Sequence, residues 1–328
     1  MQQKILDSSL SKLKKSCFPI LAYHRIIDEK AEDSNENFYY DGTVSCTVKD
    51  FESHIFFLKK YFKIVPLSKV ADHISNCTIP EGDKPFVAIT FDDGYNSLIS
   101  NVIPIVDKNN IPCTFFLSTG ILSGDAVPLY IYIEAALNNK DSFEMLLNEL
   151  DITKRKNHLA LKRSITSILA SMNQEKTRTL VEKILNVNML FGYIERNFLS
   201  VEDVRHIISP FIEVASHSHS HTDFSILGIN EIRKELTHSR KYLESVTSKR
   251  VLSFAMPFGG EKYFRNINSQ VFSSSGYENA CSTVFGLNTF SDSRLMLKRI
   301  VVNEFDTLQS IKLKLAGHLD RMAKKITY

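Results

Sequence analysis

The chain has 328 residues, of which 43% are hydrophobic and 23% are charged, as in ordinary soluble globular proteins. Its 40 basic and 37 acidic residues leave a net charge of +3, which is too small to indicate a nucleic-acid partner. The five cysteines are scattered and form no Cys-x-x-Cys pair, which argues against a disulfide framework or a thiolate zinc site and favours a reducing compartment.

The N-terminal stretch carries no recognisable targeting signal. Residues 1–16 are polar and contain lysine, without the apolar core or the small-residue cleavage site of a secretory signal. The apolar run 17–23 is too short to cross a bilayer, and no longer run follows it. Taken as a whole chain, the sequence predicts a cytoplasmic protein.

Strand-like segments alternate with helical ones along the chain. Apolar residues follow helical spacing at 51–62, after a segment from Thr47 to Asp50 that resembles a capping box, and again at 98–105 and 229–243. This βα alternation predicts parallel strands covered by helices, in a barrel or an open sheet. The predicted strands are 19–24, 86–91, 112–117, 211–216, 251–255, 278–283 and 298–302.

Residues 124–199 interrupt the alternation. They are low in glycine and proline, and their pattern predicts three or so amphipathic helices, at 143–150, 159–170 and 180–191. We interpret them as a helical insertion between two barrel strands, acting as a cap, a lid, or a surface for a membrane or partner protein. Its basic residues favour a solvated helix face, with a membrane surface as the alternative; they are Lys154, Arg155, Lys156, Lys162 and Arg163.

Two adjacent carboxylates end the second predicted strand, in residues 87–95 (VAITFDDGY). Side chains alternate along a strand, so Asp92 and Asp93 cannot share one face. Neighbouring acids repel each other unless a cation or a division of labour relieves them. The pair suits a site in which one acid binds metal and the other acts as a base, although an ordinary polar turn is the alternative.

Three histidines follow the strand at 211–216, namely His217, His219 and His221. Two histidines and a carboxylate form a zinc site with an open position for water, so the cluster favours metal over isolated core histidines. His217 and His221 would meet across one helical turn, whereas an extended segment would pair His219 with either neighbour. The spacing leaves these choices open.

Two further motifs close strands. Residues 254–260 (FAMPFGG) form a Pro/Gly turn that presents Phe258, and His24 closes the first strand within residues 21–26 (LAYHRI). Both lie at predicted C-terminal strand ends, where barrel enzymes assemble their active sites.

Together the motifs resemble the polysaccharide deacetylase family (NodB homology, carbohydrate esterase family 4), and the resemblance covers about residues 18–303. The opening Tyr23-His24 is similar to branches of that family with a Tyr-His first strand. The resemblance implies a distorted (β/α) barrel over 18–303, with 124–199 as its insertion, 1–17 as an N-terminal extension and 304–328 as a C-terminal helix. The motifs are Thr90 to Tyr95 (TFDDGY), His217-Ser218-x-Ser220-His221 and Phe254-x-x-Pro257-Phe258-Gly259.

The resemblance also implies roles. A divalent metal, most often zinc, would be bound by Asp93, His217 and His221. Asp92 would be the general base, the backbone N–H of Tyr95 would join the metal in holding the oxyanion, and a protonated histidine would protonate the amine. Pro257 and Phe258 would form a wall against the sugar.

This sequence departs from the family pattern at two places. The arginine that usually opens the third motif is replaced by Ala255, and the late Leu-x-His motif is missing where 297–300 (LKRI) stands. His24 could supply the acid, against the alternative of a core histidine. Arg299 could reach Asp92 from the last strand, or form a plain salt bridge.

The predicted function is metal-dependent removal of acetyl from an N-acetylated sugar, in a glycan or a lipid-linked glycan precursor. The partner would be that sugar, with possible contact between the basic insertion and a membrane surface. One alternative is an amidase for a non-sugar amide, since fold and metal do not fix the substrate. Another, prompted by Ala255 and the missing histidine, is a degenerate member that binds glycan without turnover.

Overall fold

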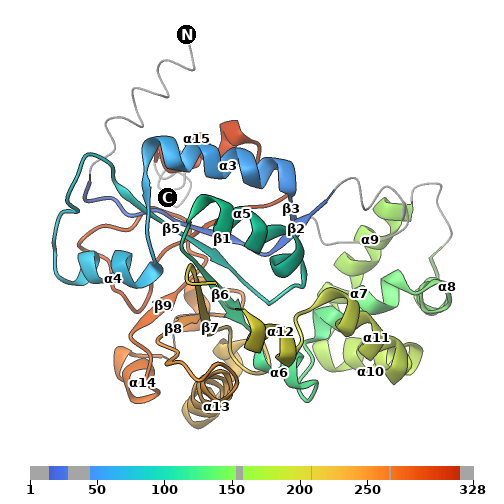
Figure 1. The fold of residues 1–328 in the computed structure, drawn as a ribbon. Helices are drawn as coiled ribbons and strands as arrows, with labels where there is room; N and C mark the ends of the chain where they lie inside the picture. Colours follow the sequence, from blue (N-terminus) through green and yellow to red (C-terminus); the bar gives the residue numbers. More distant parts are fainter. Residues whose placement is uncertain (1–14, 29–44, 153–157, 208, 266, 318–328) are drawn as a thin grey trace, which may run out of the picture.

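The computed structural model describes residues 15–28, 45–152, 158–207, 209–265 and 267–317. Its centre is a curled, parallel sheet with the strand order β10-β1-β5-β6-β7-β8-β9, and β4 pairs with the beginning of β5 (Figure 1). The bounds are β1 Ile20–Tyr23, β4 Lys63–Ile64, β5 Phe86–Phe91, β6 Cys113–Leu117, β7 Ile212–Ser216, β8 Ser253–Ala255, β9 Asn279–Cys281 and β10 Ile300–Val301.

The last strand segment brings the two edges of the sheet together. Leu297 bridges in parallel to Cys281 of β9, and three residues later Ile300 pairs with Leu21 of β1. The sheet therefore curls into the distorted (β/α) barrel that the sequence predicts. A short pair of parallel strands, β2 (Arg25–Ile27) and β3 (Ser45–Thr47), lies outside this sheet.

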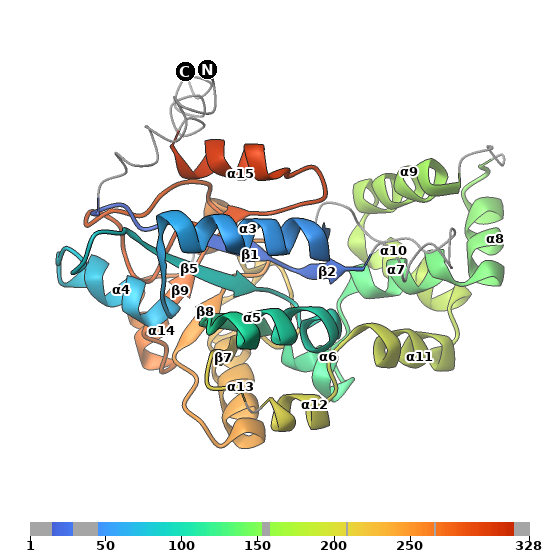
Figure 2. The same ribbon diagram turned by 45° about the horizontal axis from the view of Figure 1, so that its top comes forward.

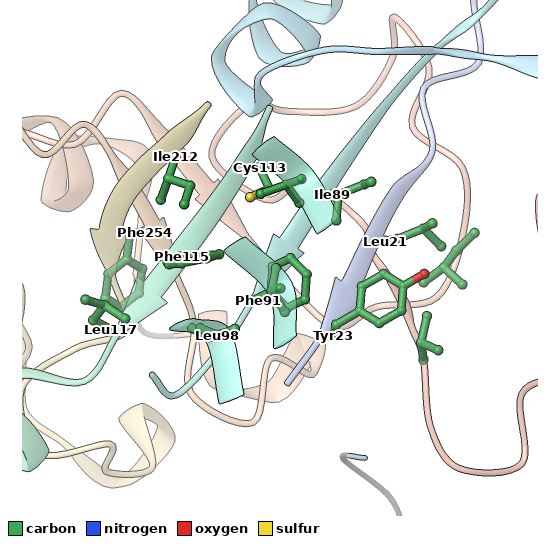
Figure 3. Packing of buried hydrophobic residues seen from close by; sticks show 14 of the residues in the cluster. Leu21, Tyr23, Ile89, Phe91, Leu98, Cys113, Phe115, Leu117, Ile212 and Phe254 are labelled. Carbon is green, nitrogen blue, oxygen red and sulfur yellow. The ribbon is translucent and has the colours of Figure 1, made fainter. Parts of the chain in front are cut away.

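Side chains on both faces of the strands are buried, which is why these strands are nearly continuous apolar runs. The outward set, including Phe91, Phe115 and Phe254, packs beneath the covering helices (Figure 3). The inward set is smaller and includes Ala88. The period of two along β5 places Asp92 on the inward face, in line with Ala88 and Thr90.

Helices surround the barrel, and α15 packs against α3 (Figure 2). Thr47 begins α3 much as the capping pattern predicts, because its Oγ1 accepts the Asp50 N–H at 3.0 Å. The covering helices are α3 Val48–Tyr61, α4 Leu67–Ser75, α5 Ile103–Asn109, α6 Thr119–Ser123, α12 Val201–His206, α13 Ile229–Thr247, α14 Ser269–Ser274 and α15 Leu308–Leu315.

The insertion packs around its own hydrophobic core on one side of the barrel (Figure 1). The described part holds five helices, which is more than the three or so that the sequence predicts. The predicted helix 180–191 is two helices, since the Asn186 side chain accepts the N–H groups of Asn188 and Met189 and begins a new helix. The five are α7 Leu129–Asn138, α8 Lys140–Glu149, α9 His158–Ser171, α10 Gln174–Ile184 and α11 Val187–Asn197.

Several other features of the structure differ from what the sequence predicts. The pattern analysis missed β4 and α4, as well as α7, whose sequence LYIYIEAALN is apolar almost all round and shows little helical periodicity. Lys154, Arg155 and Lys156 lie outside the described residues, and Lys162 is buried with its ammonium over the Phe143 ring, so it is not on a solvated face. No described helix is long and apolar enough to cross a membrane.

Candidate active site

A cavity of about 400 Å³ lies at the C-terminal ends of the barrel strands. One side is formed by barrel residues and the other by the insertion. The barrel side includes His24, Asp92, Asp93, Tyr95, His217, His221, Met256, Phe258, Thr283 and Val301, and the insertion side includes Tyr130, Ile133, Glu134 and Thr166. The predicted catalytic motifs therefore meet at one place.

Asp93, His217 and His221 form a buried cluster whose donor atoms all lie within 4.8 Å of one another. Asp93 Oδ1 is 3.4 Å from Nε2 of each histidine and has no hydrogen-bond partner among the described residues. His217 donates its Nδ1–H to the Ala255 carbonyl at 2.9 Å, which leaves Nε2 as a lone-pair donor. Two imidazole nitrogens and one unpartnered carboxylate oxygen fit a zinc ion with an open position.

A loop, not a helical turn, brings His217 and His221 together. Ser218 and His221 adopt left-handed φ angles of 65° and 51°, and Ser218 Oγ accepts the His221 N–H at 3.0 Å. His219 points elsewhere, with Nδ1 2.9 Å from Thr119 Oγ1. Of the pairings that the spacing left open, the structure places only His217 and His221 beside Asp93.

Two neighbours hold this histidine loop from outside. Glu235 on α13 accepts the N–H groups of His219 and Ser220 through one carboxylate oxygen, at 3.0 and 2.9 Å. Gly120 on α6 donates its N–H to the His219 carbonyl at 2.8 Å. A Cβ at Gly120 would lie 2.6 Å from that carbonyl and 2.4 Å from the Ala126 carbonyl, so the close approach requires glycine.

Asp92 directly precedes Asp93 of the candidate metal-ligand cluster and is held by Arg299. The two guanidinium Nη atoms reach the two carboxylate oxygens at 2.7 Å each, and both side chains are buried. Arg299 also donates to Thr90 Oγ1 and to the Ser282 carbonyl, so its position is fixed on several sides. The guanidinium missing at Ala255 is thus supplied from the last strand, and Arg299 is the partner of Asp92.

The adjacent carboxylates are both ionised, for different reasons. Burial alone would raise the pKa of Asp92, but the Arg299 guanidinium and its hydrogen bonds lower that pKa. Burial would likewise raise the pKa of Asp93, and the His217 and His221 imidazoles hold it well below its usual range. One acid is paired with a permanent cation and the other with the two candidate metal ligands.

The remaining predicted residues lie at different distances from the centre. His24 follows β1 and lines the cavity, with Nδ1 buried and without a partner among the described residues. Burial lowers the pKa of His24 more than the Asp93 and Asp92 charges raise it. Phe258 is half-exposed with its ring edge-on to His221, whereas Pro257 is buried and does not line the cavity; Met256 does.

The family model described as polysaccharide deacetylase matches residues 80–138 and 164–280, more than half of the chain. The chain belongs to the polysaccharide deacetylase family. No curated protein matches it.

Several solved structures share the fold of this chain. The Streptococcus pyogenes deacetylase PplD in complex with acetate aligns with a TM-score of 0.57 at 16% identity, covering 91% of this chain and 98% of that chain. IcaB from Ammonifex degensii aligns with a TM-score of 0.56 at 13% identity, covering 92% and 98%. The de-N-acetylase from Aggregatibacter actinomycetemcomitans aligns with 0.55 at 16%, covering 91% and 99%.

The insertion side of the cavity was not predicted from the sequence. Glu134 on α7 and Arg25 on β2 form a buried ion pair at 3.4 Å, and Tyr193 on α11 donates its hydroxyl to Glu134 at 2.9 Å. A single acid within the apolar segment 126–137 was the available signal, because an isolated buried carboxylate needs a partner. Tyr130 of the same helix packs its ring edge-on to His221.

Backbone strain gathers at this site. Asp93, Ser218, His221 and Phe258 are non-glycine residues with positive φ, and all four belong to the loops around the cluster. Such conformations cost on the order of 1 kcal/mol or more each and persist only where surrounding contacts impose them. The surrounding contacts thus impose the conformation of the loops that carry Asp93, His217 and His221.

Proposed function

We propose that this protein is a metal-dependent N-deacetylase that removes the acetyl group from an N-acetylated sugar, in a glycan or a lipid-linked glycan precursor. The observation that carries the proposal is the juxtaposition of the Asp93–His217–His221 cluster with the Arg299-held Asp92 in one cavity. Membership of the polysaccharide deacetylase family supports the same reaction class.

Asp93, His217 and His221 would hold the ion, and the chemistry of two imidazoles and one carboxylate favours zinc. When bound, the metal supplies a Lewis acid that acidifies water and polarises an acyl oxygen. Asp92, kept ionised and oriented by Arg299, accepts the proton of the attacking water. The backbone N–H of Tyr95 donates to the acyl oxygen as negative charge develops there.

The amine that leaves must gain a proton, because an amide anion is a very poor leaving group. We assign that proton to His24, which directly follows β1 and lines the same cavity as the cluster. Phe258, half-exposed beside His221, offers an aromatic face on which a sugar ring can pack. Pro257 supports the turn that carries Phe258.

We place this reaction in the cytoplasm, on a precursor assembled at the membrane. The burial of Lys162 removes one cation from the basic helix face on which the proposed membrane contact depends. Sedimentation with vesicles containing anionic lipid tests the contact, and protein that stays in the supernatant at low salt would remove it from the proposal.

The test of the proposed function is acetate release by metal-stripped protein, with and without added Zn²⁺, from N-acetylated sugar oligomers and lipid-linked N-acetyl sugars. We expect release that returns with zinc and is absent in Asp92→Asn. Activity on small cyclic amides alone would instead select the non-sugar amidase. Metal and glycan binding without release at high protein concentration would select the binding protein.

A further inference from the structure

The loop that carries Asp93 and Tyr95 is clamped by the insertion. Tyr95 forms an antiparallel bridge with Phe198, just beyond α11. On either side of that bridge, the Leu199 N–H donates to the Gly94 carbonyl and the Asn96 N–H to the Asn197 carbonyl, both at 2.9 Å. The backbone of the catalytic turn is therefore paired with the end of the insertion rather than with the barrel alone.

Two side chains pack against the Tyr95 ring. Phe198 stacks on it at 4.7 Å between ring centroids, and the Arg25 guanidinium carbon lies 4.2 Å from the Tyr95 centroid. Tyr95 is almost fully buried, so its ring is held and only its backbone remains for the chemistry. A guanidinium is planar and can lie flat on an aromatic ring, which an ammonium cannot reproduce.

The position of Arg25 is in turn set by the insertion. Glu134 on α7 pairs with Arg25, and Tyr193 on α11 donates to the same carboxylate oxygen of Glu134. In both ribbon views β2, which carries Arg25, runs from the barrel towards the insertion (Figures 1 and 2). Arg25 also directly follows His24, so fixing Arg25 fixes the backbone beside the proposed acid.

We propose that Arg25 and Glu134 are positioning residues that hold the Tyr95 turn, and with it the N–H that faces the acyl oxygen, so that the helical insertion is part of the catalytic apparatus rather than a cap. This inference rests on the proposed function. Neither Arg25 nor Glu134 belongs to the Asp93–His217–His221 cluster, so we expect a conservative change at either residue to weaken the chemical step while zinc still binds.

The experiment compares Arg25→Lys with the wild type, both loaded with zinc. Lysine keeps the charge opposite Glu134 but removes the flat face on Tyr95. Arg178→Lys is the control, because Arg178 likewise lies over a tyrosine ring, that of Tyr132 at 5.1 Å, and pairs with Glu182 at 3.2 Å. Arg178 is partly exposed, and Tyr132, unlike Tyr95, does not line the cavity. Zinc stoichiometry, kcat and KM for an N-acetylated sugar oligomer, and thermal unfolding are measured for each protein.

We expect Arg25→Lys to bind one zinc ion as the wild type does and to lose at least tenfold in kcat with KM changed less than threefold, and Arg178→Lys to be unchanged. Glu134→Gln should lower kcat in the same way. A kcat within twofold of wild type for Arg25→Lys overturns the inference, as does a loss that follows the zinc content.

A wild type that releases no acetate contradicts the proposed function and not this inference. The arrangement around Tyr95 is then tested by calorimetric titration of the zinc-loaded proteins with acetate, one oxygen of which would take the place of the acyl oxygen. At least threefold weaker binding by Arg25→Lys than by Arg178→Lys supports the clamp, and equal binding overturns it.

Discussion

The two sides of the cavity are built differently. On the barrel side, charged groups come directly from strand ends and are partnered by other motif residues, as in the Asp92–Arg299 pair and the Asp93–His217–His221 cluster. On the insertion side, a single buried ion pair, Arg25–Glu134, lies among aromatic rings. The two sides therefore have different tasks. The barrel side carries the groups that we expect to react, and the insertion side holds the turn that carries one of them.

The largest effects are expected from the reacting groups on the barrel side. Asp92→Asn should retain zinc and lose at least about 10³-fold in kcat, because an amide cannot accept the proton. His217→Ala should lose both zinc and turnover. Metal analysis and acetate release check both variants. His219→Ala, in the same loop but turned towards Thr119, should keep its zinc; zinc lost from Asp92→Asn would mean that the two carboxylates exchange roles.

Replacing Arg299, the buried cation on the barrel side, should lower the free energy of unfolding as well as the activity. Arg299→Met leaves a buried carboxylate unpaired, which destabilises by roughly 3–5 kcal/mol in chemical denaturation. The double variant Asp92→Asn with Arg299→Met should recover most of that loss, since it removes the uncompensated charge. If the single variant unfolds like the wild type, the pair does not hold the barrel side together.

Two glycine substitutions, one beside the histidine loop and one in the insertion, should differ in their effect on zinc affinity, with smaller changes than those above. Gly120→Ala would push a Cβ to 2.6 Å from the His219 carbonyl, so the histidine loop must shift, and we expect zinc affinity to fall by about tenfold. Gly192→Ala on α11 meets only Arg196 Nη1 at 3.5 Å and should leave zinc affinity unchanged and the helix slightly more stable. Competition with a chromogenic zinc chelator measures both; equal affinities would show that the loop tolerates the shift.

The smallest effect that we expect is a pH dependence of folding stability, which arises at a buried histidine outside both sides of the cavity. Burial lowers the pKa of His54 to about 4, and its Nδ1 lies 3.2 Å from the Tyr23 hydroxyl. Because the unfolded chain binds the proton more tightly, stability is lost as the pH falls below about 6.5 and the loss ends near pH 4. His54 should account for about 2 kcal/mol of lost stability between pH 7 and pH 5.

Denaturation of His54→Gln at both pH values isolates this contribution, because glutamine keeps an acceptor near Tyr23 but does not titrate. The exposed His206→Gln is the control and should follow the wild type. An unchanged pH slope in His54→Gln would assign the acid sensitivity to the site itself.

The barrel and its motifs were predictable because their signals are local. The six residues before Asp92, apolar except for Thr90, predict a buried strand, and the histidine cluster after β7 predicts a metal site. The spacing of the histidines did not decide which two would meet, because the left-handed turn at Ser218 has no sequence signature of its own, and the pair His217 and His221 came from the family resemblance. The Arg25–Glu134 pair joins residues 109 apart, and no period or spacing in the sequence relates them.

The strand segment that closes the barrel has a consequence for how the protein is made. Arg299 lies 207 residues beyond Asp92, on the segment that joins β9 to β1. During synthesis, the strand with Asp92 leaves the ribosome long before Arg299 is made. The growing chain therefore carries a carboxylate that cannot be buried at an acceptable free energy. Barrel closure and completion of the catalytic pair are therefore the same late event, and a partly synthesised chain cannot hold a finished site.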